Sequence, residues 1–257
     1  MMNIKSPAQI EKMREAGQLL AYVMDRLRTM IEPGITTKRL NEEAERIMKK
    51  YSATPSFLGV PSSWRGYPSF PAAICASPDD QVVHGMPNDE PLKDGQIISI
   101  DCGVKLNGWH SDSAFTALVG DVPKAVRDLV LITEDCFKVG LRKAVVGNRV
   151  GAISHEVQKY AEGHGYGVVR ELCGHGIGRE LHEDPSVPNF GRTEHGPKLK
   201  SGMTICIEPM ITLGGPDIFH EADGWTIKTR DHSACSHHEH TILITDGEPE
   251  ILTLPRL

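Results

Sequence analysis

Apolar residues recur at helical spacing near the start of the chain. They stand three or four positions apart, which predicts an amphipathic helix over residues 6–31. Ser6 is a suitable N-cap, and Gln9 three residues later completes a capping box. The Glu-Pro-Gly sequence at 32–34 ends the predicted helix. The positions on its inner face are Ile10, Met13, Gly17, Leu20, Met24, Leu27 and Ile31.

A second helix and a series of strands follow, and the same order then repeats. The second helix begins at Thr36 or Thr37, and residues 54–71, rich in Pro, Ser and Gly, are expected to form an irregular loop. Pro123 opens another long helix, and a further helix begins at about residue 150. Strands are predicted at 72–77, 96–104, 109–119, 166–170, 203–208, 225–229 and 239–245.

The two series of elements align with each other. Placing Gly34 on Gly147 matches the apolar positions of the second helix in each series. The matched pairs are Leu40 with Ile153, Ala44 with Val157 and Ile47 with Tyr160. We therefore predict an α/β (α+β) fold of one domain, residues 1–257, with related halves at roughly 1–120 and 121–257 and a site between them. A chance match stays open, because helix-helix-strand order is common.

The composition is that of an ordinary globular protein. Apolar residues make up 39% and charged residues 24% of the chain, which excludes a disordered protein or a coiled coil. The net charge is −6 with scattered Lys and Arg, so we expect no nucleic-acid partner. The sequence shows neither a secretory leader nor a membrane span, so we expect a cytoplasmic protein without a membrane partner. The six cysteines form no C-x-x-C pair, which predicts reduced thiols.

Several familiar catalytic motifs are missing from the sequence. It contains no G-x-S-x-G, no H-E-x-x-H and no G-x-x-x-x-G-K-[ST], and the glycines of 174–179 do not fit the dinucleotide-binding fingerprint. These absences disfavour serine hydrolases, zincins, P-loop enzymes and Rossmann enzymes. The remaining candidates are acidic residues and histidines in apolar or glycine-rich surroundings.

Residues 97–112 predict a β-hairpin that carries two aspartates. Asn107 and Gly108 stand between alternating strands, a strong signal for a two-residue type I′ turn. The resulting register pairs Asp112 with Gly103 and Asp101 with Ala114. Asp101 and Asp112 then become diagonal neighbours on one face, close enough to bind one pair of metal ions together.

Two glutamates repeat this unusual placement of a carboxylate in an apolar strand. Glu208 ends the run Thr-Ile-Cys-Ile, and Glu239 opens the strand Glu-His-Thr-Ile. For any single carboxylate, a solvated surface position is the more common explanation. Four of them in buried strands would repel one another, and two divalent cations would supply the compensating charge.

Histidines complete the candidate site. His175 lies among three glycines, which allow the backbone to approach whatever the imidazole contacts. A lone histidine is more often a core or surface residue, but beside two Asp and two Glu it indicates a dinuclear site for Mn, Fe, Co or Zn. His84 and His182, each beside a turn, are further candidates. His237 and His238 precede Glu239 and are expected to surround it.

At these residues the sequence resembles the type I methionine aminopeptidases, metal-dependent enzymes with the pita-bread fold. That fold has pseudo-two-fold halves around a curved, mostly antiparallel sheet with helices outside. The resemblance spans nearly the whole chain. The segments that carry it are Val-Val-His84-Gly-Met-Pro, Ile-Asp101-Cys with Asp112 eleven residues on, Cys-Gly-His175-Gly-Ile-Gly, His182-Glu, Thr-Ile-Cys-Ile-Glu208-Pro-Met and Glu239-His-Thr-Ile.

The resemblance implies a set of ligands and catalytic residues. The ligands of two divalent ions (Co, Mn, Fe or Zn) would be Asp101, Asp112, His175, Glu208 and Glu239. Asp112 and Glu239 would bridge the ions, and a water activated there would attack the first peptide bond. Glu208 would also transfer the proton of that water. His182 would polarise the scissile carbonyl, and His84 would contact the peptide beyond the cleaved bond.

The resemblance also implies a substrate and a place of action. Tyr67, Phe70, Cys75 and Trp225 would form the pocket for the methionine side chain. The substrates would be the N-termini of nascent polypeptides with a small second residue, met at the ribosome exit by a monomeric enzyme. The chain departs from the family pattern in a longer connection at 58–65. It also departs at Asp79, Asp80 and Gln81 and at the His237-His238 pair, which replaces Gln and an aromatic residue.

Two other functions share much of this evidence. A prolidase has the same ligands and fold but carries an extra N-terminal domain, for which this chain is too short. A non-catalytic binding protein of the same fold is an alternative from another class. Such relatives have usually lost ligands, whereas all five ligand types are present here. The sequence therefore favours the aminopeptidase.

Overall fold

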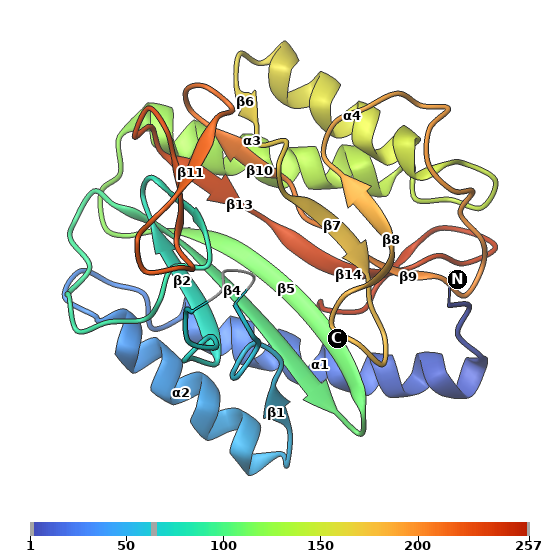
Figure 1. Cartoon of the computed structure of the whole chain (residues 1–257), viewed down its shortest axis with the longest axis horizontal. Helices are drawn as coiled ribbons and strands as arrows, with labels where there is room; N and C mark the ends of the chain where they lie inside the picture. The colour runs from blue at the N-terminus through green and yellow to red at the C-terminus, as the bar shows by residue number, and fades with distance from the viewer. Residues whose placement is uncertain (1–2, 63–65, 256–257) are drawn as a thin grey trace.

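The chain folds around a curved antiparallel sheet (Figure 1). This computed structural model describes residues 3–62 and 66–255. Within these residues the sheet has nine strands. They are β1 (Thr54–Pro55), β2 (Ile74–Pro78), β4 (Ile97–Leu106), β5 (Trp109–Leu118), β7 (Cys173–Gly176), β8 (Glu183–Pro188), β9 (Thr204–Ile207), β14 (Glu239–Leu243) and β15 (Glu250–Ile251).

The order of the strands brings the two ends of the sequence together. The strands run β1-β4-β5-β14-β9-β7-β8, with β2 beside β4 and β15 beside β14. The central neighbours β5 and β14 are far apart in sequence, so the first and last parts of the chain share one sheet. Two three-stranded sheets complete the fold: β13 (Cys235–His237), β10 (Met210–Thr212) and β6 (Gly167–Val168), and β11 (Ile218–His220), β12 (Ile227–Thr229) and β3 (Gln81–Val83).

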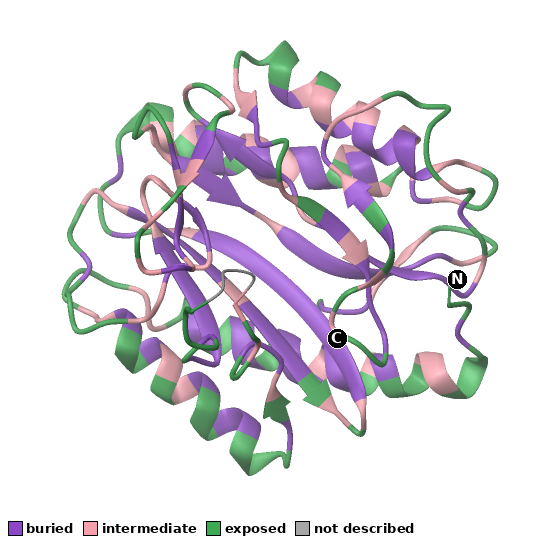
Figure 2. Ribbon diagram, in the orientation of Figure 1, coloured by how far each residue is buried: buried purple, intermediate pink, exposed green. Residues whose placement is uncertain are grey.

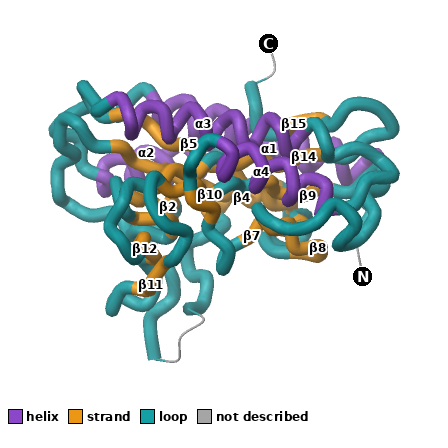
Figure 3. The backbone as a smooth tube through the Cα atoms, turned by 90° about the horizontal axis from the view of Figure 1, so that it is seen from above, coloured by secondary structure: helices purple, strands orange, loops and turns teal. Residues whose placement is uncertain are grey.

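Four helices in the described ranges lie along one side of the strands (Figure 3). They are α1 (Pro7–Arg28), α2 (Thr37–Lys50), α3 (Lys124–Leu141) and α4 (Val150–Gly163). The Ser6 amide donates to the Gln9 side chain at 2.9 Å, as the predicted capping box requires. Thr36 caps α2, because its hydroxyl accepts a hydrogen bond from the Arg39 amide. Local sequence therefore sets where these two helices begin.

The hydrophobic core lies between the helices and the sheet, whose strands are largely buried (Figure 2). Leu40 and Ile47 of α2 pack in one cluster with Ile98 and Ile100 of β4. A second cluster joins α3 and α4 to the other half of the sheet. Its members include Phe137, Ile153, Ile205, Ile207 and Ile242. This packing directs alternate residues of the same strands to the opposite face of the sheet.

The register of the predicted hairpin is confirmed. Gly103 pairs with Asp112 and Asp101 pairs with Ala114 across β4 and β5. Asn107 and Gly108 form the turn with φ values of 51° and 79°, the left-handed conformations that a type I′ turn needs. The turn residues therefore fix the relative position of the two aspartates.

The second helix of each series and the glycine before it can be compared directly in the structure. The bounds of α4 equal those of α2 shifted by 113 residues, the offset between Gly34 and Gly147. Both glycines have a positive φ, 95° and 93°. The Gly34 amide donates to the Leu92 carbonyl at 2.8 Å, and the Gly147 amide donates to the Leu199 carbonyl at 3.2 Å. These repeated contacts support the hypothesis of two related halves.

Several elements differ from the sequence prediction. The helix predicted to residue 31 ends at Arg28, because the amides of Met30 and Ile31 bond to carbonyls three residues back and form a turn. Strands β7 and β8 are absent from the prediction, since Gly and Pro within them hide the strand pattern. The loop expected at 54–71 contains the short strand β1, and residues 63–65 of it lie outside the described residues.

The structure bears on the predictions of reduced thiols and of no membrane span. All six cysteines are free, five of them buried and Cys173 exposed. Among the described residues, no helix has the length and apolar character needed to cross a membrane.

Candidate metal centre and substrate cavity

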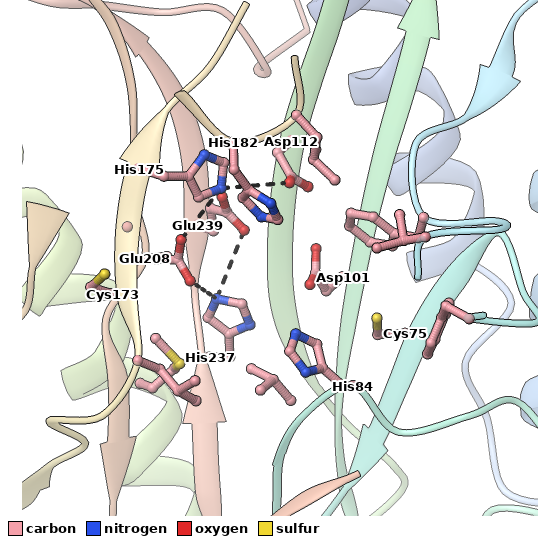
Figure 4. A pocket seen from close by; sticks show the side chains of 18 of the residues that line it. Cys75, His84, Asp101, Asp112, Cys173, His175, His182, Glu208, His237 and Glu239 are labelled. Atoms are coloured by element: carbon pink, nitrogen blue, oxygen red, sulfur yellow. Dashed lines mark ion pairs between the residues drawn. The ribbon is translucent and has the colours of Figure 1, made fainter. Parts of the chain in front are cut away.

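Side chains from both parts of the chain line one cavity of about 860 Å³ (Figure 4). All five predicted metal ligands, together with His84, His182, Phe70, Cys75 and Trp225, are on its wall. The sequence therefore brings most of its candidate residues to one place. Tyr67 is the exception: it is 42% exposed, packs near Gly224 and does not line this cavity.

The hairpin presents its two aspartates to the cavity. Ile100 and Cys102 of β4 face the helices, so Asp101 between them faces the opposite side of the sheet. Asp112 lies beside it on β5. Carboxylate oxygens of Asp101, Asp112 and Glu239 lie within 4.8 Å of one another. Three acidic groups from β4, β5 and β14 thus surround one small volume.

The C-terminal part of the chain supplies the other donors. Glu239 opens β14 opposite Ala114, and Glu208 directly follows β9. The Nε2 atom of His175 on β7 lies 3.7 Å from Glu208 Oε1 and 3.9 Å from Asp112 Oδ2. In Figure 4 the imidazole and the carboxylates point toward a common centre.

Burial raises the pKa of all four carboxyl groups, and repulsion by neighbouring carboxylates raises the pKa of Asp101, Glu208 and Glu239 further. Desolvation is the largest cause in each case. The negative charges of Asp112 and Glu239 raise the pKa of Asp101 further, and those of Asp101 and Asp112 do the same for Glu208. Such a cluster is stable in its charged form only with compensating positive charge.

The donor atoms fit divalent metal ions. Within the described residues, Asp101 Oδ1 and Glu239 Oε1 are buried and have no hydrogen-bond partner. Cations would satisfy these oxygens and neutralise the charge of the cluster. Carboxylates with an imidazole are ligands that Mn, Fe, Co and Zn accept.

His175 is held in an orientation suited to metal binding. Its Nδ1 lies 2.8 Å from the carbonyl oxygen of Gly176, so Nδ1 carries the proton and donates to that oxygen. The lone pair of Nε2, which faces the carboxylates, is then free to bind a metal ion. Burial lowers its pKa to about 4, so the ring is neutral at pH 7. Gly174 lies against the Cys206 carbonyl of β9, and any side chain there would collide with it. Gly174 therefore allows β7 and β9 to pack closely.

The other two predicted histidines lie on the cavity wall near the carboxylates. The ring of His182 contacts that of His175, with centroids 4.4 Å apart. The His84 ring stands edge-on to Trp225 at 6.2 Å. Burial is the main cause that lowers the pKa of both, to about 4 for His84. Both rings are therefore neutral near pH 7.

An apolar pocket adjoins the carboxylates. Phe70 and Trp225 stack edge to face with centroids 5.1 Å apart, and Cys75 pairs with Asp101 across β2 and β4. Phe57, Val60 and Leu181 belong to the same cluster and line the cavity but are absent from the sequence prediction. They come from irregular segments, where no periodic pattern shows which side chains are buried.

His237 is a further cavity residue that is absent from the predicted ligand set. Its side chain at the end of β13 faces the carboxylates of both Glu208 and Glu239, and dashed lines join it to each of them in Figure 4. Its position two residues before Glu239 is the only signal in the sequence. The prediction that His237 and His238 surround Glu239 is met by His237, whereas His238 packs on Phe137.

Comparison with known protein families identifies the family to which this chain belongs. A model of Metallopeptidase family M24 matches residues 11–246. The chain belongs to metallopeptidase family M24. Members of this family are metal-dependent peptidases, which agrees with the cluster of buried donors described above. The protein is therefore a hydrolase of peptide bonds that binds divalent metal.

The chain is similar over its full length to proteins of the family named methionine aminopeptidase. It is 47% identical to the methionine aminopeptidase of Clostridium perfringens, with 99% of each chain covered. It is 45% identical to methionine aminopeptidase 1 of Bacillus subtilis, covering 98% of this chain and 99% of the relative.

Solved structures agree with the fold. The crystal structure of methionine aminopeptidase from Rickettsia prowazekii matches with a TM-score of 0.94 and 40% identity, covering 99% of this chain and all of that one. Prolidase from Pyrococcus furiosus matches with a TM-score of 0.78 at 21% identity, covering 99% of this chain and 66% of that one. The second match shows the fold alone. The pita-bread fold expected from the sequence is confirmed.

Proposed function

We propose that this protein is a methionine aminopeptidase that removes the initiator methionine when the second residue is small. The observation that carries the proposal is one cavity in which four buried carboxylates and His175 adjoin an apolar pocket. The carboxylates and the imidazole suit metal-dependent hydrolysis, and the apolar pocket suits an unbranched thioether side chain. The full-length similarity to methionine aminopeptidases supports the same substrate.

Two divalent ions, from Mn, Fe, Co or Zn, would be held at this site. The ligands would be Asp101, Asp112, His175, Glu208 and Glu239. Glu239 is shared by all three groups of closely spaced donors, and Asp112 lies near both Asp101 and His175, which supports bridging roles for these two residues. When bound, the ions would supply Lewis-acid chemistry that polarises the scissile carbonyl and makes water more acidic.

Glu208 would act as the proton carrier. It stands at the end of β9 beside His175 and His237, at the edge of the carboxylate cluster. It would accept the proton of the attacking water and return it to the leaving amine.

His182 and His84 would contact the substrate peptide on either side of the cleaved bond. A neutral imidazole carries one N–H, which His182 would donate to the scissile carbonyl oxygen as negative charge develops there. His84 would donate to the peptide beyond that bond. Both rings lie on the wall of the same cavity, so a large second side chain of the peptide would come into contact with them.

The methionine side chain would occupy the apolar pocket. Phe70, Cys75 and Trp225 are the predicted members, and the cavity-lining residues of the same cluster extend it. An edge-to-face pair of aromatic rings beside a thioether is a favourable environment for sulfur. Tyr67 would act only at the rim, if a longer peptide reaches it.

We further propose that the enzyme works as a monomer in the cytoplasm on nascent chains at the ribosome exit. The absence of a membrane-spanning helix among the described residues is compatible with this setting. Light scattering after gel filtration tests the monomer, and co-sedimentation with translating ribosomes tests the place of action.

The experiment that tests the function compares peptides side by side. Release of methionine is measured from Met-Gly-x, Met-Ala-x and Met-Arg-x peptides. Release of the first residue is measured from x-Pro peptides. Each assay is run with and without a chelator. We expect fast, metal-dependent release from Met-Gly-x and Met-Ala-x and slow release from Met-Arg-x. Equal rates for Met-Ala-x and Met-Arg-x would contradict the proposal, and preference for x-Pro would indicate a prolidase.

A further inference from the structure

His237 occupies a central place in the cavity that the predicted roles leave unexplained. Its side chain is almost completely buried, with 1% of the residue exposed. The Nε2 atom lies 3.9 Å from Glu208 Oε2 and 3.8 Å from Glu239 Oε2 (Figure 4). Both distances exceed a hydrogen bond. The ring therefore faces two proposed ligands without bonding to either.

Neither ring nitrogen of His237 has a hydrogen-bond partner within the part of the chain that the structure describes. Buried imidazoles normally bond through both nitrogens, because an unpaired polar atom away from water is costly. The two atoms that face Nε2 are carboxylate oxygens. A cation between these three atoms would give the nitrogen and both oxygens a partner.

The spacing of these atoms suits a shared ion. One atom each from Glu208, His237 and Glu239 lies within 4.8 Å of the other two. Ligand atoms that are each about 2.1 Å from one ion lie at most about 4.2 Å apart. The distances from His237 Nε2 to the two carboxylates, 3.9 and 3.8 Å, are within this limit.

We propose that His237 is a sixth protein ligand of the metal centre, binding through Nε2 the ion that Glu208 and Glu239 hold. This inference rests on the two-ion site proposed above. With His175 it gives the centre two imidazoles, both of which lie close to Glu208.

A second imidazole has a consequence for metal choice. Imidazole suits Zn, Fe, Ni and Cu, whereas carboxylates alone suit Mg and Mn. The ion beside His237 is therefore expected to be bound more tightly when it is Zn²⁺ or Co²⁺ than when it is Mn²⁺. The ion held by Asp101 and Asp112 is expected to discriminate less between these metals.

The first test counts imidazole ligands in the wild-type protein loaded with two equivalents of Co²⁺. A bound imidazole whose other nitrogen is protonated gives one exchangeable proton signal, which the unpaired electrons of Co²⁺ shift far outside the normal proton NMR range. We expect two such signals, from His175 and His237. One signal would overturn the inference, and this count needs no variant.

The second test compares two matched variants by calorimetric titration with Zn²⁺, Co²⁺ and Mn²⁺. His237→Gln is expected to remove one shifted signal and to weaken binding of one Zn²⁺ or Co²⁺ ion by at least about tenfold, since loss of groups that only support a ligand already costs about 10–100-fold. Mn²⁺ affinity should fall less. His238→Gln is the control, because His238 packs on Phe137 and does not line the cavity.

The outcomes separate this inference from the proposed function. Unchanged affinities and two remaining signals in His237→Gln would contradict the extra ligand while leaving the two-ion enzyme intact. A wild-type protein that binds no Co²⁺ would overturn both. An equal effect of His238→Gln would assign the change to the fold and would also overturn the inference.

Discussion

The two halves of the molecule supply their metal-site donors in different ways. The N-terminal half places Asp101 and Asp112 on one hairpin of two ten-residue strands. The C-terminal half places His175, Glu208 and Glu239 on or beside three separate strands of only four or five residues. The first pair depends on a two-residue turn, whereas the second group depends on packing between distant segments.

This difference indicates which substitutions should alter the positions of the metal-site donors. A hairpin keeps its register even if its surroundings shift, because its hydrogen bonds are local. Three short strands keep their relative positions only while the close contacts between them hold. We therefore expect the C-terminal donors to be more sensitive to packing changes than the hairpin aspartates.

The largest effect is expected when the ions that would join the two halves are removed. Extensive chelation should abolish peptide hydrolysis, and Mn²⁺, Co²⁺ or Fe²⁺ should restore it, because the ions would supply the Lewis acid and the positive charge that the clustered carboxylates need. The measurement is methionine release before and after dialysis against chelator and metal. Full turnover by protein shown to contain no metal would end the dinuclear hypothesis.

Next in size is a comparison of one carboxylate from each half. Glu208→Gln should lower kcat by about 10²–10⁴-fold with KM changed much less, because a positioned acid–base group is lost. Asp101→Asn removes a ligand charge but no proton carrier, so it should keep kcat within about tenfold once metal is saturating. Metal content must be measured in both variants. If kcat of fully loaded Glu208→Gln also stays within tenfold, Glu208 is only a ligand.

The stability of the metal-free protein should depend on pH with a definite sign. The pKa of Asp112 is raised from 3.8 to about 7 by burial, so the folded state binds its proton more tightly than the unfolded state does. The contribution of Asp112 to the free energy of unfolding should then be greatest below pH 4 and fall as the pH rises through about 7, by on the order of a few kcal/mol. Urea unfolding of the metal-free wild type and of Asp112→Asn at several pH values measures this contribution as the difference between the two proteins. The metal-loaded protein should not show the fall, and a contribution that is larger at pH 7 than at pH 4 would contradict the effect of burial described above.

A smaller effect tests the packing of the C-terminal donors. Gly174→Ala should lower the free energy of unfolding by about 1–3 kcal/mol and weaken metal binding, since its methyl group would meet the Cys206 backbone and displace His175. Thermal melts and metal titrations measure the two effects. Gly163→Ala is the control, because nothing lies within 4 Å of the added carbon. Unchanged metal affinity in Gly174→Ala would refute the expected sensitivity.

The smallest effect is expected at the hairpin turn. Gly108→Ala keeps adequate space, with Arg179 3.6 Å away, but places alanine at a φ of 79°. We expect a loss of about 1–2 kcal/mol in unfolding free energy and unchanged metal affinity. Gly108→Asn should lose less, because asparagine tolerates the left-handed conformation. A fall in metal affinity as large as that of Gly174→Ala would remove the distinction between the halves.

The features that could be predicted from the sequence are those with a local cause. The hairpin register follows from Asn107 and Gly108, and the start of α2 follows from Thr36 as its cap. The carboxylates stood out because charged groups in apolar strands are rare. Their meeting in one cavity agrees with the structure, while their individual roles stay predictions.

The features that were missed have non-local causes. Strand β7 contains two glycines and forms because β8 and β9 pack against it, so its sequence carries no strand pattern. Phe57 and Leu181 reach the pocket from irregular segments. Tyr67 looked like a pocket residue by resemblance, but the loop that carries it directs it toward Gly224. Irregular loops do not reveal in sequence which way their side chains point.

Helices α1 to α4 lie on one face of the sheet, so substitutions that affect stability and substitutions that affect the cavity fall in different parts of the molecule. Substitutions on the helix side of the sheet change how firmly the sheet is supported (Figure 3). The cavity lies on the opposite side, where strand residues supply the proposed metal ligands and loop residues supply part of the apolar pocket. The loops that carry Phe57 and Leu181 could therefore diverge toward other side chains without rebuilding the core. A scaffold of this kind leaves substrate preference free to evolve while its hydrolytic chemistry stays fixed.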